Sequence, residues 1–217
     1  MDDGKGSLYI VSTPIGNLGD FTYRSVETLR KVHLIAAEDT RRTRILLNHY
    51  QIQTPLSSFH SYNQIKKGQG FVDILNAGKD LALVSDAGTP GISDPLFHLV
   101  RLAIENGVSV YSIPGPSAAV SALTVSGLPV DRFVFEGFLP VKKRRRKRLD
   151  ELAKEKRTIV LYESPHRMER TLRDLHEALG DRKVVVAREL TKMYEEVIRS
   201  SLSEMVSEQA RKWRGEI

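Results

Sequence analysis

The sequence contains no cysteine among its 217 residues. This absence excludes disulfide bonds, thiolate zinc sites and cysteine nucleophiles, and it fits a protein of the reducing cytoplasm. No apolar run approaches the roughly 20 residues that a membrane-spanning helix requires, so we expect no such helix. Residues 1–5 carry acidic side chains and no apolar core, so they are not expected to act as a signal peptide.

Several common catalytic and phosphate-binding motifs are also missing. The sequence has no G-x-G-x-x-G for a dinucleotide, no G-x-x-x-x-G-K-[ST] for a nucleoside triphosphate, no H-E-x-x-H for zinc and no G-x-S-x-G nucleophile elbow. It also shows no repeat of short, fixed period. The function must therefore be sought in a set of loops, not in one short signature.

The charge balance is basic. There are 33 Lys and Arg against 27 Asp and Glu, which gives a net charge of +6 and a pI of about 9.5. The hydrophobic fraction of 41% and the charged fraction of 28% are those of an ordinary globular protein, long enough for one large domain or two small ones. An excess of cations favours an anionic partner such as nucleic acid.

Short apolar runs alternate with turn-rich loops and amphipathic segments. We expect strands at 8–11, 34–37, 54–59, 81–84, 108–113, 132–136, 158–162 and 183–187, and helices over 23–32, 41–50, from 96, from 118, over 142–153 and over 168–179. This alternation predicts an α/β protein with a parallel sheet covered by helices. Turn residues at Gly127, Pro129 and Asp131 predict an N-terminal α/β domain at 1–128 and a C-terminal α/β domain at 129–217.

Five predicted strand exits combine turn-forming residues with the start of a helix. The longest is 85–95, SDAGTPGISDP, where Asp94 is expected to cap a helix and Pro95 to begin it. Glycine lets a backbone approach a ligand closely, and a helix N-terminus offers unpaired N–H groups to a carboxylate or phosphate. Ligands of open α/β sheets lie over such loops, so we expect a small-molecule site there. The other four exits are 12–17, 38–41, 114–117 and 163–167.

Residues 142–148 are seven consecutive basic residues. Seven like charges repel one another, and a polyanion that neutralises them would relieve that repulsion, giving affinity and register without sequence choice. A solvated face or a flexible loop is the alternative interpretation. Arg41, Arg42 and Arg44 follow a candidate site loop and extend the basic surface.

Seven motifs occur together in one order: TPIGN (13–17), AEDTR (37–41), SDAGTPGISDP (85–95), IPGPSA (113–118), FEGFLP (135–140), YESPHR (162–167) and ARELTK (187–192). With these motifs the chain closely resembles the ribosomal RNA small-subunit methyltransferase I family, a branch of the tetrapyrrole methylase superfamily. The resemblance runs from about Gly6 to Glu216, and its most specific parts are SDAGTPGISDP and YESPHR.

The resemblance implies the tetrapyrrole methylase fold, with two α/β domains and a cofactor cleft between them. It implies methylation, with S-adenosylmethionine as the donor, of the ribose 2′-hydroxyl of a cytidine in the decoding region of small-subunit (16S) ribosomal RNA. It also implies a homodimer. The residues expected to contact the methyl donor, many through their backbone, are Pro14, Ile15, Asp86, Ala87, Gly88, Thr89, Pro116, Ser117, Tyr162 and Ala187.

The same resemblance directs attention to residues that would act on the RNA. A 2′-hydroxyl is weakly acidic, so we expect a partly desolvated base to help remove its proton. The candidates for that base are Lys192, Glu189 and Glu163. We expect no metal in the reaction, and the partner to be small-subunit ribosomal RNA or the 30S subunit. The residues expected to contact RNA are Arg41, Arg42, Lys142, Lys143, Arg144, Arg145, Arg146, Lys147, Arg148, His166 and Arg167.

Two other functions remain open at this point. A methyltransferase for a small tetrapyrrole-type molecule would use the same site but gives no reason for the basic run. A non-catalytic RNA-binding protein would keep the fold without the reaction. Members of the family usually continue beyond the Gly215-Glu216 position with another apolar strand, so we expect the last strand of the C-terminal domain to be truncated here.

Overall fold

A computed structural model of the chain describes residues 4–92, 97–208 and 211–217. The chain divides into two compact units, Met1–Ser117 and Ala118–Ile217. Helix α5 (Ala118–Ser126) therefore falls in the second unit, whereas the sequence boundary after residue 128 assigned it to the first. The reason is packing, because α5 contacts three strands of the second unit, β7, β8 and β9.

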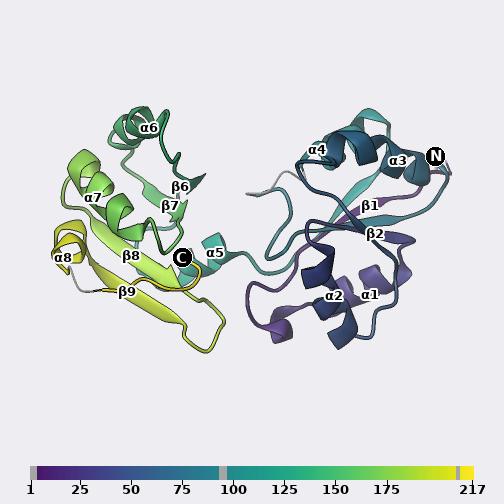
Figure 1. The fold of residues 1–217 in the computed structure, drawn as a ribbon, viewed down its shortest axis with the longest axis horizontal. Coiled ribbons are helices and arrows are strands. Elements are labelled where there is room, and N and C mark those ends of the chain that lie inside the picture. The colour runs from purple at the N-terminus through teal and green to yellow at the C-terminus, as the bar shows by residue number, and fades with distance from the viewer. Residues whose placement is uncertain (1–3, 93–96, 209–210) are drawn as a thin grey trace. The chain divides into compact units, whose positions relative to one another are not determined.

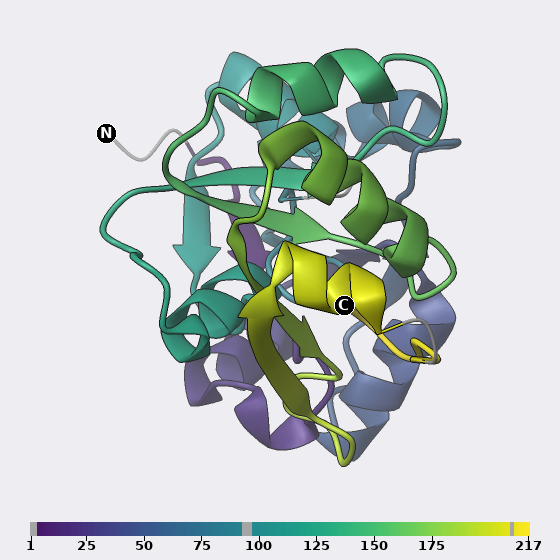
Figure 2. The same cartoon turned by 90° about the vertical axis from the view of Figure 1, so that its left-hand side faces the viewer.

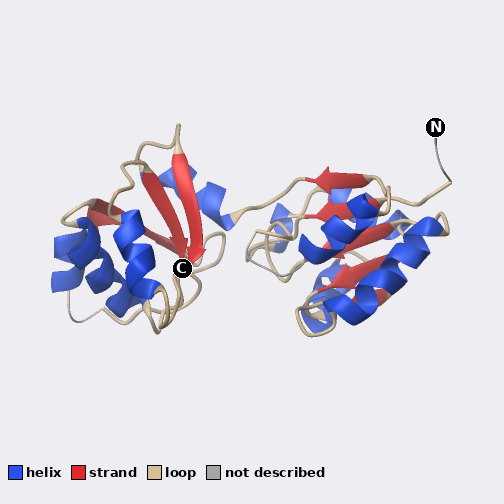
Figure 3. Cartoon of the chain, turned by 90° about the horizontal axis from the view of Figure 1, so that it is seen from above, coloured by secondary structure: helices blue, strands red, loops and turns tan. Residues whose placement is uncertain are grey.

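The first unit is built on one five-stranded sheet in the order β3-β2-β4-β1-β5, and every pair of neighbouring strands is parallel. Figure 3 shows these strands lying side by side. Because all five strands run in the same direction, their carboxyl ends meet at one edge of the sheet. The strands are β1 (Leu8–Val11), β2 (Leu34–Ala37), β3 (Leu56–Ser58), β4 (Leu81–Val84) and β5 (Val110–Ile113).

Helices cover both faces of this sheet (Figure 1). Leu29 of α1 and Leu46 of α2 belong to one buried cluster, and Leu75 of α3 and Leu99 of α4 belong to another. The chain moves across the sheet in one direction from β1 to β2 to β3, and in the opposite direction from β3 to β4 to β5. Because crossovers between parallel strands are right-handed, this reversal places the two pairs of helices on opposite faces. The helices are α1 (Tyr23–Lys31), α2 (Thr40–His49), α3 (Gln64–Asn76) and α4 (Phe97–Glu105).

The strand predictions for the first unit are confirmed, and helix α3 is an element that the sequence did not predict. Side-chain caps begin α1 and α2, because Thr22 accepts from the Ser25 N–H and Asp39 accepts from the Arg41 N–H. The expected cap at Asp94 and first helical residue at Pro95 lie outside the described residues, and α4 is described from Phe97 onward.

The second unit contains two two-stranded sheets. Strands β6 (Phe133–Phe138) and β7 (Thr158–Tyr162) are parallel, whereas β8 (Lys183–Arg188) and β9 (Glu196–Ser201) are antiparallel. The expected parallel sheet is thus found in the first unit, whereas the second unit adds one antiparallel pair that the sequence did not predict. The connection between β8 and β9 is too short for the crossover that parallel strands require.

Three helices pack together in the second unit. Helices α6 (Arg145–Leu152), α7 (Met168–Leu179) and α8 (Leu202–Ser207) lie next to one another, as Figure 2 shows from the side. Their apolar side chains form one buried cluster with strand β8, to which Leu149, Leu172, Val186 and Met205 belong. No helix in the described part of the chain is long and apolar enough to cross a membrane.

Candidate functional site

The loops that follow β1, β4 and β5 are joined by hydrogen bonds at the carboxyl edge of the first sheet. Thr13 and Gly88 exchange backbone hydrogen bonds of 2.9 and 3.0 Å. The Thr89 hydroxyl lies 2.9 Å from the Ser12 hydroxyl and donates to the Pro116 carbonyl at 3.3 Å. We call these residues, together with Gly115, the exit seam. The structure thus brings Gly88, Thr89 and Pro116, three of the residues expected to contact a methyl donor, into one place.

Glycines at two positions of the exit seam allow its close backbone contacts. Gly88 has φ = +75°, a conformation that favours glycine, and a Cβ there would lie 3.5 Å from Ile15 Cγ2. A Cβ on Gly115 would lie 2.9 Å from the Cβ of Ser12, which is closer than side chains approach one another. Ala87, next to Gly88, is exposed. Ser12, Thr13 and Gly88 are buried. The seam therefore presents to a ligand over this edge the exposed Gly115 and the half-buried Thr89 and Pro116, with Ala87 beside them.

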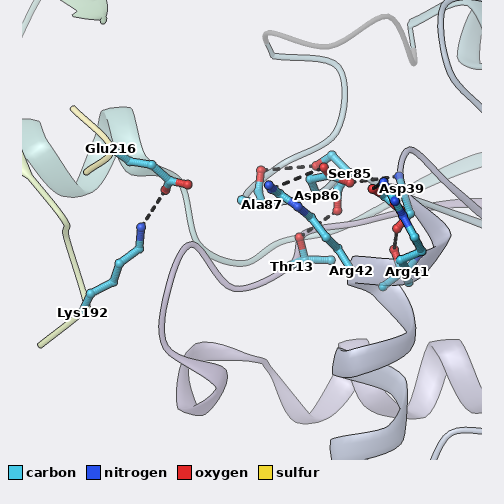
Figure 4. Close-up of polar contacts among 10 residues, drawn as sticks. Thr13, Asp39, Arg41, Arg42, Ser85, Asp86, Ala87, Lys192 and Glu216 are labelled. Carbon is cyan, nitrogen blue, oxygen red and sulfur yellow. Dashed lines mark hydrogen bonds and ion pairs between the residues drawn. The ribbon is translucent and has the colours of Figure 1, made fainter. Parts of the chain in front are cut away.

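Asp86 connects the β4 exit to the start of α2 (Figure 4). One carboxylate oxygen accepts the Asp39 N–H at 2.9 Å, and the other lies 3.5 Å from the Arg42 guanidinium. A quarter of the Asp86 side chain is exposed. Arg41 donates to the Asp39 carboxylate at 2.7 Å, and this hydrogen bond holds the pKa of Asp39 well below its usual range. Arg41 and Arg42 are exposed but paired cations at the same edge.

In the second unit, the two residues expected to contact the methyl donor lie in different sheets. Tyr162 ends β7, with its ring centroid 5.2 Å from that of Phe135 and 5.6 Å from that of Phe138. Burial raises the pKa of the Tyr162 hydroxyl, although a backbone hydrogen bond from Ala119 opposes the shift. Ala187 lies in β8, where it pairs with Val197, and is half-buried.

Lys192 lies in the turn between β8 and β9 and pairs with two carboxylates. Its Nζ is 2.8 Å from Glu189 and 3.0 Å from Glu216 (Figure 4). Burial lowers the pKa of Lys192, but the two carboxylates outweigh it and raise the pKa overall. The Lys192 ammonium in turn lowers the pKa of Glu189. Lys192 and Glu189 are therefore both charged at neutral pH.

Glu163 is buried in the second unit with only 5% of its surface exposed. Its carboxylate accepts from the Thr171 hydroxyl at 2.6 Å and lies 3.1 Å from Arg167, which also donates to the Leu139 carbonyl at 2.6 Å. Of the three candidate bases, Glu163 is thus the one committed to an interior network. His166, in the same loop, is exposed.

The basic run is not a uniform surface. Arg145 is 5% exposed and donates to Asp174 at 2.7 Å, to Thr171 at 2.9 Å and to the Pro140 carbonyl at 3.2 Å. It is therefore unavailable to a nucleic acid in this structure, contrary to the expectation that all seven residues face RNA. Its buried partner Thr171 was not singled out from the sequence, although it is a polar residue on the otherwise apolar face of α7.

The remaining six residues of the run are exposed or half-buried, and they differ in their partners. Arg146 pairs with Asp150 at 3.2 Å and Glu177 at 2.9 Å, and Arg148 pairs with Glu136 and Glu151. Within the run, Lys142, Lys143, Arg144 and Lys147 form no ion pair with any other described residue. We call these four the free cations. Among all the residues that the structure describes, no cluster of His, Asp and Glu has the arrangement of a metal site.

Comparison with known proteins places this architecture in a family. The family of tetrapyrrole (corrin/porphyrin) methylases matches residues 7–206. A relative from Halalkalibacterium halodurans, named ribosomal RNA small subunit methyltransferase I, is 53% identical over 94% of this chain and 71% of its own length. A relative of the same name from Thermotoga maritima is 52% identical over 93% of this chain and 91% of its own length.

Solved structures share the fold at low sequence identity. A cobalt precorrin-4 methyltransferase aligns with a TM-score of 0.69 and 18% identity over 93% of this chain and 87% of its own. A uroporphyrin III C-methyltransferase from Thermus thermophilus aligns with a TM-score of 0.67 and 16% identity over 97% of this chain and 95% of its own. From its sequence and its fold together, the chain belongs to the tetrapyrrole methylases and, within them, to the ribosomal RNA small subunit methyltransferase I family.

Proposed function

We propose that the protein transfers a methyl group from S-adenosylmethionine to the ribose 2′-hydroxyl of a cytidine in the decoding region of small-subunit ribosomal RNA. The observation that carries the proposal is the exit seam, where hydrogen bonds join three neighbouring strand exits at the carboxyl edge of a parallel sheet. The names of the relatives support ribosomal RNA as the substrate.

The residues of the exit seam suit the proposed cofactor. S-adenosylmethionine carries a cation and several hydroxyl and amine groups, and the partly exposed Asp86 carboxylate can accept hydrogen bonds from groups of this kind. Pro14, Ile15, Ala87, Gly88, Thr89, Pro116 and Ser117 hold the cofactor largely through backbone contacts in this proposal, and Tyr162 and Ala187 of the second unit complete the site. When bound, the cofactor supplies an electrophilic methyl group and departs as a neutral thioether.

The charges around Lys192 assign roles to two of the candidate bases. Because the pKa of Lys192 is raised, this side chain acts as an ammonium, which stabilises negative charge as it develops on the 2′-oxygen. The Glu189 carboxylate beside it accepts the hydroxyl proton. Glu163 holds Arg167 in place, and the part of the Arg167 guanidinium that remains exposed binds a phosphate next to the target nucleotide.

The free cations are proposed to bind the RNA backbone. Changing Lys142, Lys143, Arg144 and Lys147 together to Gln should weaken RNA binding and reduce the slope of log affinity against log salt by roughly 3, since each phosphate contact contributes about 0.7–0.9. Affinity for S-adenosylmethionine should stay as in the wild type. Lys183→Gln removes an exposed cation elsewhere in the second unit and serves as the control. An unchanged salt slope in the fourfold variant would reject this role.

Transfer of labelled methyl groups tests the function directly. We expect label in assembled small subunits or in naked small-subunit RNA, recovered after nuclease digestion as 2′-O-methylcytidine. Label recovered in a base would refute the 2′-hydroxyl assignment. Label in a small tetrapyrrole and none in RNA would favour the small-molecule reaction of the wider family. Binding of RNA without binding of the donor in calorimetry would leave a non-catalytic RNA-binding protein.

We also propose that the active form is a homodimer. Sedimentation velocity at the concentration used in the transfer assay tests this, and a sedimentation coefficient of the 24.4 kDa monomer under active conditions would contradict it.

A further inference from the structure

The loop that follows β3 lies at the same edge of the first sheet as the exit seam. Ser58 of β3 pairs with Ala37 of β2, and the Phe59 N–H donates to the Ala37 carbonyl at 2.7 Å. Because β3 is parallel to β2, residues 59–63 emerge beside the β2 exit that carries Asp39. None of the roles assigned above uses this loop.

The loop presents large apolar side chains to solvent. Tyr62 is 97% exposed and Ile65, in the first turn of α3, is 83% exposed. This exposure does not arise from a loose loop, because several hydrogen bonds brace it. The Asn63 side chain accepts the His60 N–H at 2.9 Å and donates to the Ser58 carbonyl at 3.2 Å, and Lys67 Nζ donates to the same carbonyl at 3.0 Å.

Two buried polar atoms of the same loop have no partner. These are His60 Nδ1 and Gln64 Oε1, two of the four such side-chain atoms in the described part of the chain. The His60 ring meets the Tyr62 ring edge-on, with centroids 6.1 Å apart. Buried polar atoms of this kind are commonly paired by an ordered water, so the groups that the loop offers to a partner are the exposed Tyr62 and Ile65 side chains.

A cation without an ion pair follows the loop. Lys66 comes directly after Ile65 in α3, and its side chain is exposed and in no ion pair within the described residues. An exposed ring and an exposed aliphatic side chain followed by an unpaired cation match the chemistry of an unpaired nucleotide, which offers a flat base for stacking and a phosphate for pairing.

We propose that Tyr62, Ile65 and Lys66 form a stacking platform for an unpaired nucleotide of the RNA substrate, separate from the nucleotide that is methylated. This inference rests on the proposed function and adds to it a second RNA contact, carried by the first unit. The Tyr62 ring stacks on the base, and Lys66 binds a flanking phosphate. RNA proteins bind splayed-out bases in this way, with tolerance of sequence, because every base has a flat face.

The test compares the stacking residue with the cation in the 217-residue chain. Tyr62→Ala should weaken binding of a naked small-subunit RNA fragment by roughly 5- to 100-fold and leave the salt slope unchanged, whereas Tyr62→Phe should bind as the wild type. Lys66→Gln should lower the salt slope by about 0.7. Affinity for S-adenosylmethionine, measured by calorimetry, should not change in any of the three variants.

The matched control is Ile104→Ala. Ile104 is 62% exposed near the C-terminal end of α4, and a helix that follows a parallel strand returns to the opposite edge of the sheet. If Ile104→Ala binds RNA with wild-type affinity, the loss of an exposed apolar side chain is not by itself sufficient to weaken RNA binding. Circular dichroism on each variant confirms that the fold is retained.

The outcomes separate the platform from the function on which it rests. If the wild type methylates RNA and Tyr62→Ala binds RNA as tightly as the wild type, the platform is refuted and the function stands. If Tyr62→Ala loses transfer to assembled subunits but binds naked RNA normally, the surface contacts a ribosomal protein and the platform is also refuted. If the wild type neither binds nor methylates RNA, the proposed function itself fails.

Discussion

At the scale of single residues, the exit seam depends on the missing side chain of Gly115. Gly115 has no Cβ, and this allows its backbone to lie against the Cβ of Ser12. A methyl group added to Gly115 would collide with the Ser12 Cβ. A Cβ is fixed by the backbone, so it cannot move aside as the end of a long side chain can. The seam is therefore sensitive to the smallest substitutions.

Gly115→Ala should destabilise the protein by about 1–3 kcal/mol through overpacking, and should also weaken S-adenosylmethionine binding. Ser12→Gly removes the opposing Cβ but loses the hydroxyl contact with Thr89, at a cost of about 1 kcal/mol. The double variant should lose less than the sum of the two, as measured by urea unfolding. Gly70→Ala, with open space around its Cβ in helix α3, is the control and should not destabilise. If the losses in the free energy of unfolding of the two single variants simply add in the double variant, the contact between positions 12 and 115 does not affect stability.

A second residue-scale prediction concerns pH. The pKa of Lys192 lies above its ordinary value and that of Glu189 below, so their ion pair is lost only at high pH as Lys192 deprotonates, or in acid as Glu189 protonates. The single-turnover rate should therefore be flat between about pH 6 and about pH 9. Lys192→Gln should lower kcat with little change in KM, and Lys192→Arg should recover part of it. A wild-type rate that rises tenfold per pH unit would instead make neutral Lys192 the base.

Residue identity alone did not separate the members of the basic run. Lys142 and Arg145 both read as cations of one segment, yet one is exposed and the other is 5% exposed. The difference arises from tertiary packing, because α7 places Thr171 and Asp174 where a guanidinium at position 145 can reach both. The sequence of the run does not indicate that Arg145 is the buried residue, whereas the fold of the second unit does.

At the scale of elements, a buried polar network fixes α6 against α7. Arg145 of α6 donates to Thr171 and Asp174 of α7, and Thr171 donates to Glu163 in the loop that holds Arg167. The two helices therefore share one hydrogen-bond system with the candidate RNA-binding loop. A charge that stays buried after its partner is removed is expensive, so this network should be far more sensitive than surface ion pairs.

Arg145→Gln should destabilise the protein by about 1–3 kcal/mol, because it leaves the buried Thr171 hydroxyl and the Pro140 carbonyl without their donor. Arg146→Gln, one residue later in the same helix, removes a guanidinium that is paired but largely exposed, and should cost less than about 1 kcal/mol. Chemical unfolding of both variants checks the contrast. Equal losses would mean that the network contributes no more than a surface pair.

The elements divide into those with strong local patterns and those without. Strand β4, LALV, is apolar throughout because it is buried on both faces, and it was predicted residue for residue. Helix α3 carries Lys66, Lys67 and two glycines, which blur its apolar period, and it was missed. Strand β9 was missed because its residues, EVIRSS, are half-buried and its partner β8 lies within a hairpin whose turn has no Asn-Gly or Gly-Gly signal.

At the scale of the whole molecule, the chain consists of two units with separate cores. The exit seam lies in the first unit, whereas Tyr162 and Ala187 lie in the second. The proposed site therefore requires residues of both units on one cofactor. This follows from the family resemblance and not from contacts within either unit, so it needs a test that changes one unit only.

Ala187→Trp provides that test, because Ala187 lies in the second unit at a half-buried position near the end of β8. If both units contribute to the site, the large side chain should occupy space meant for the cofactor and weaken S-adenosylmethionine binding by tenfold or more, about 1.4 kcal/mol. Lys183→Trp, at the exposed start of the same strand, is the matched control and should bind normally. Normal binding by Ala187→Trp, with the fold intact by circular dichroism, would confine the site to the first unit. The exit seam alone would then have to hold the cofactor, and the second unit would serve only the RNA.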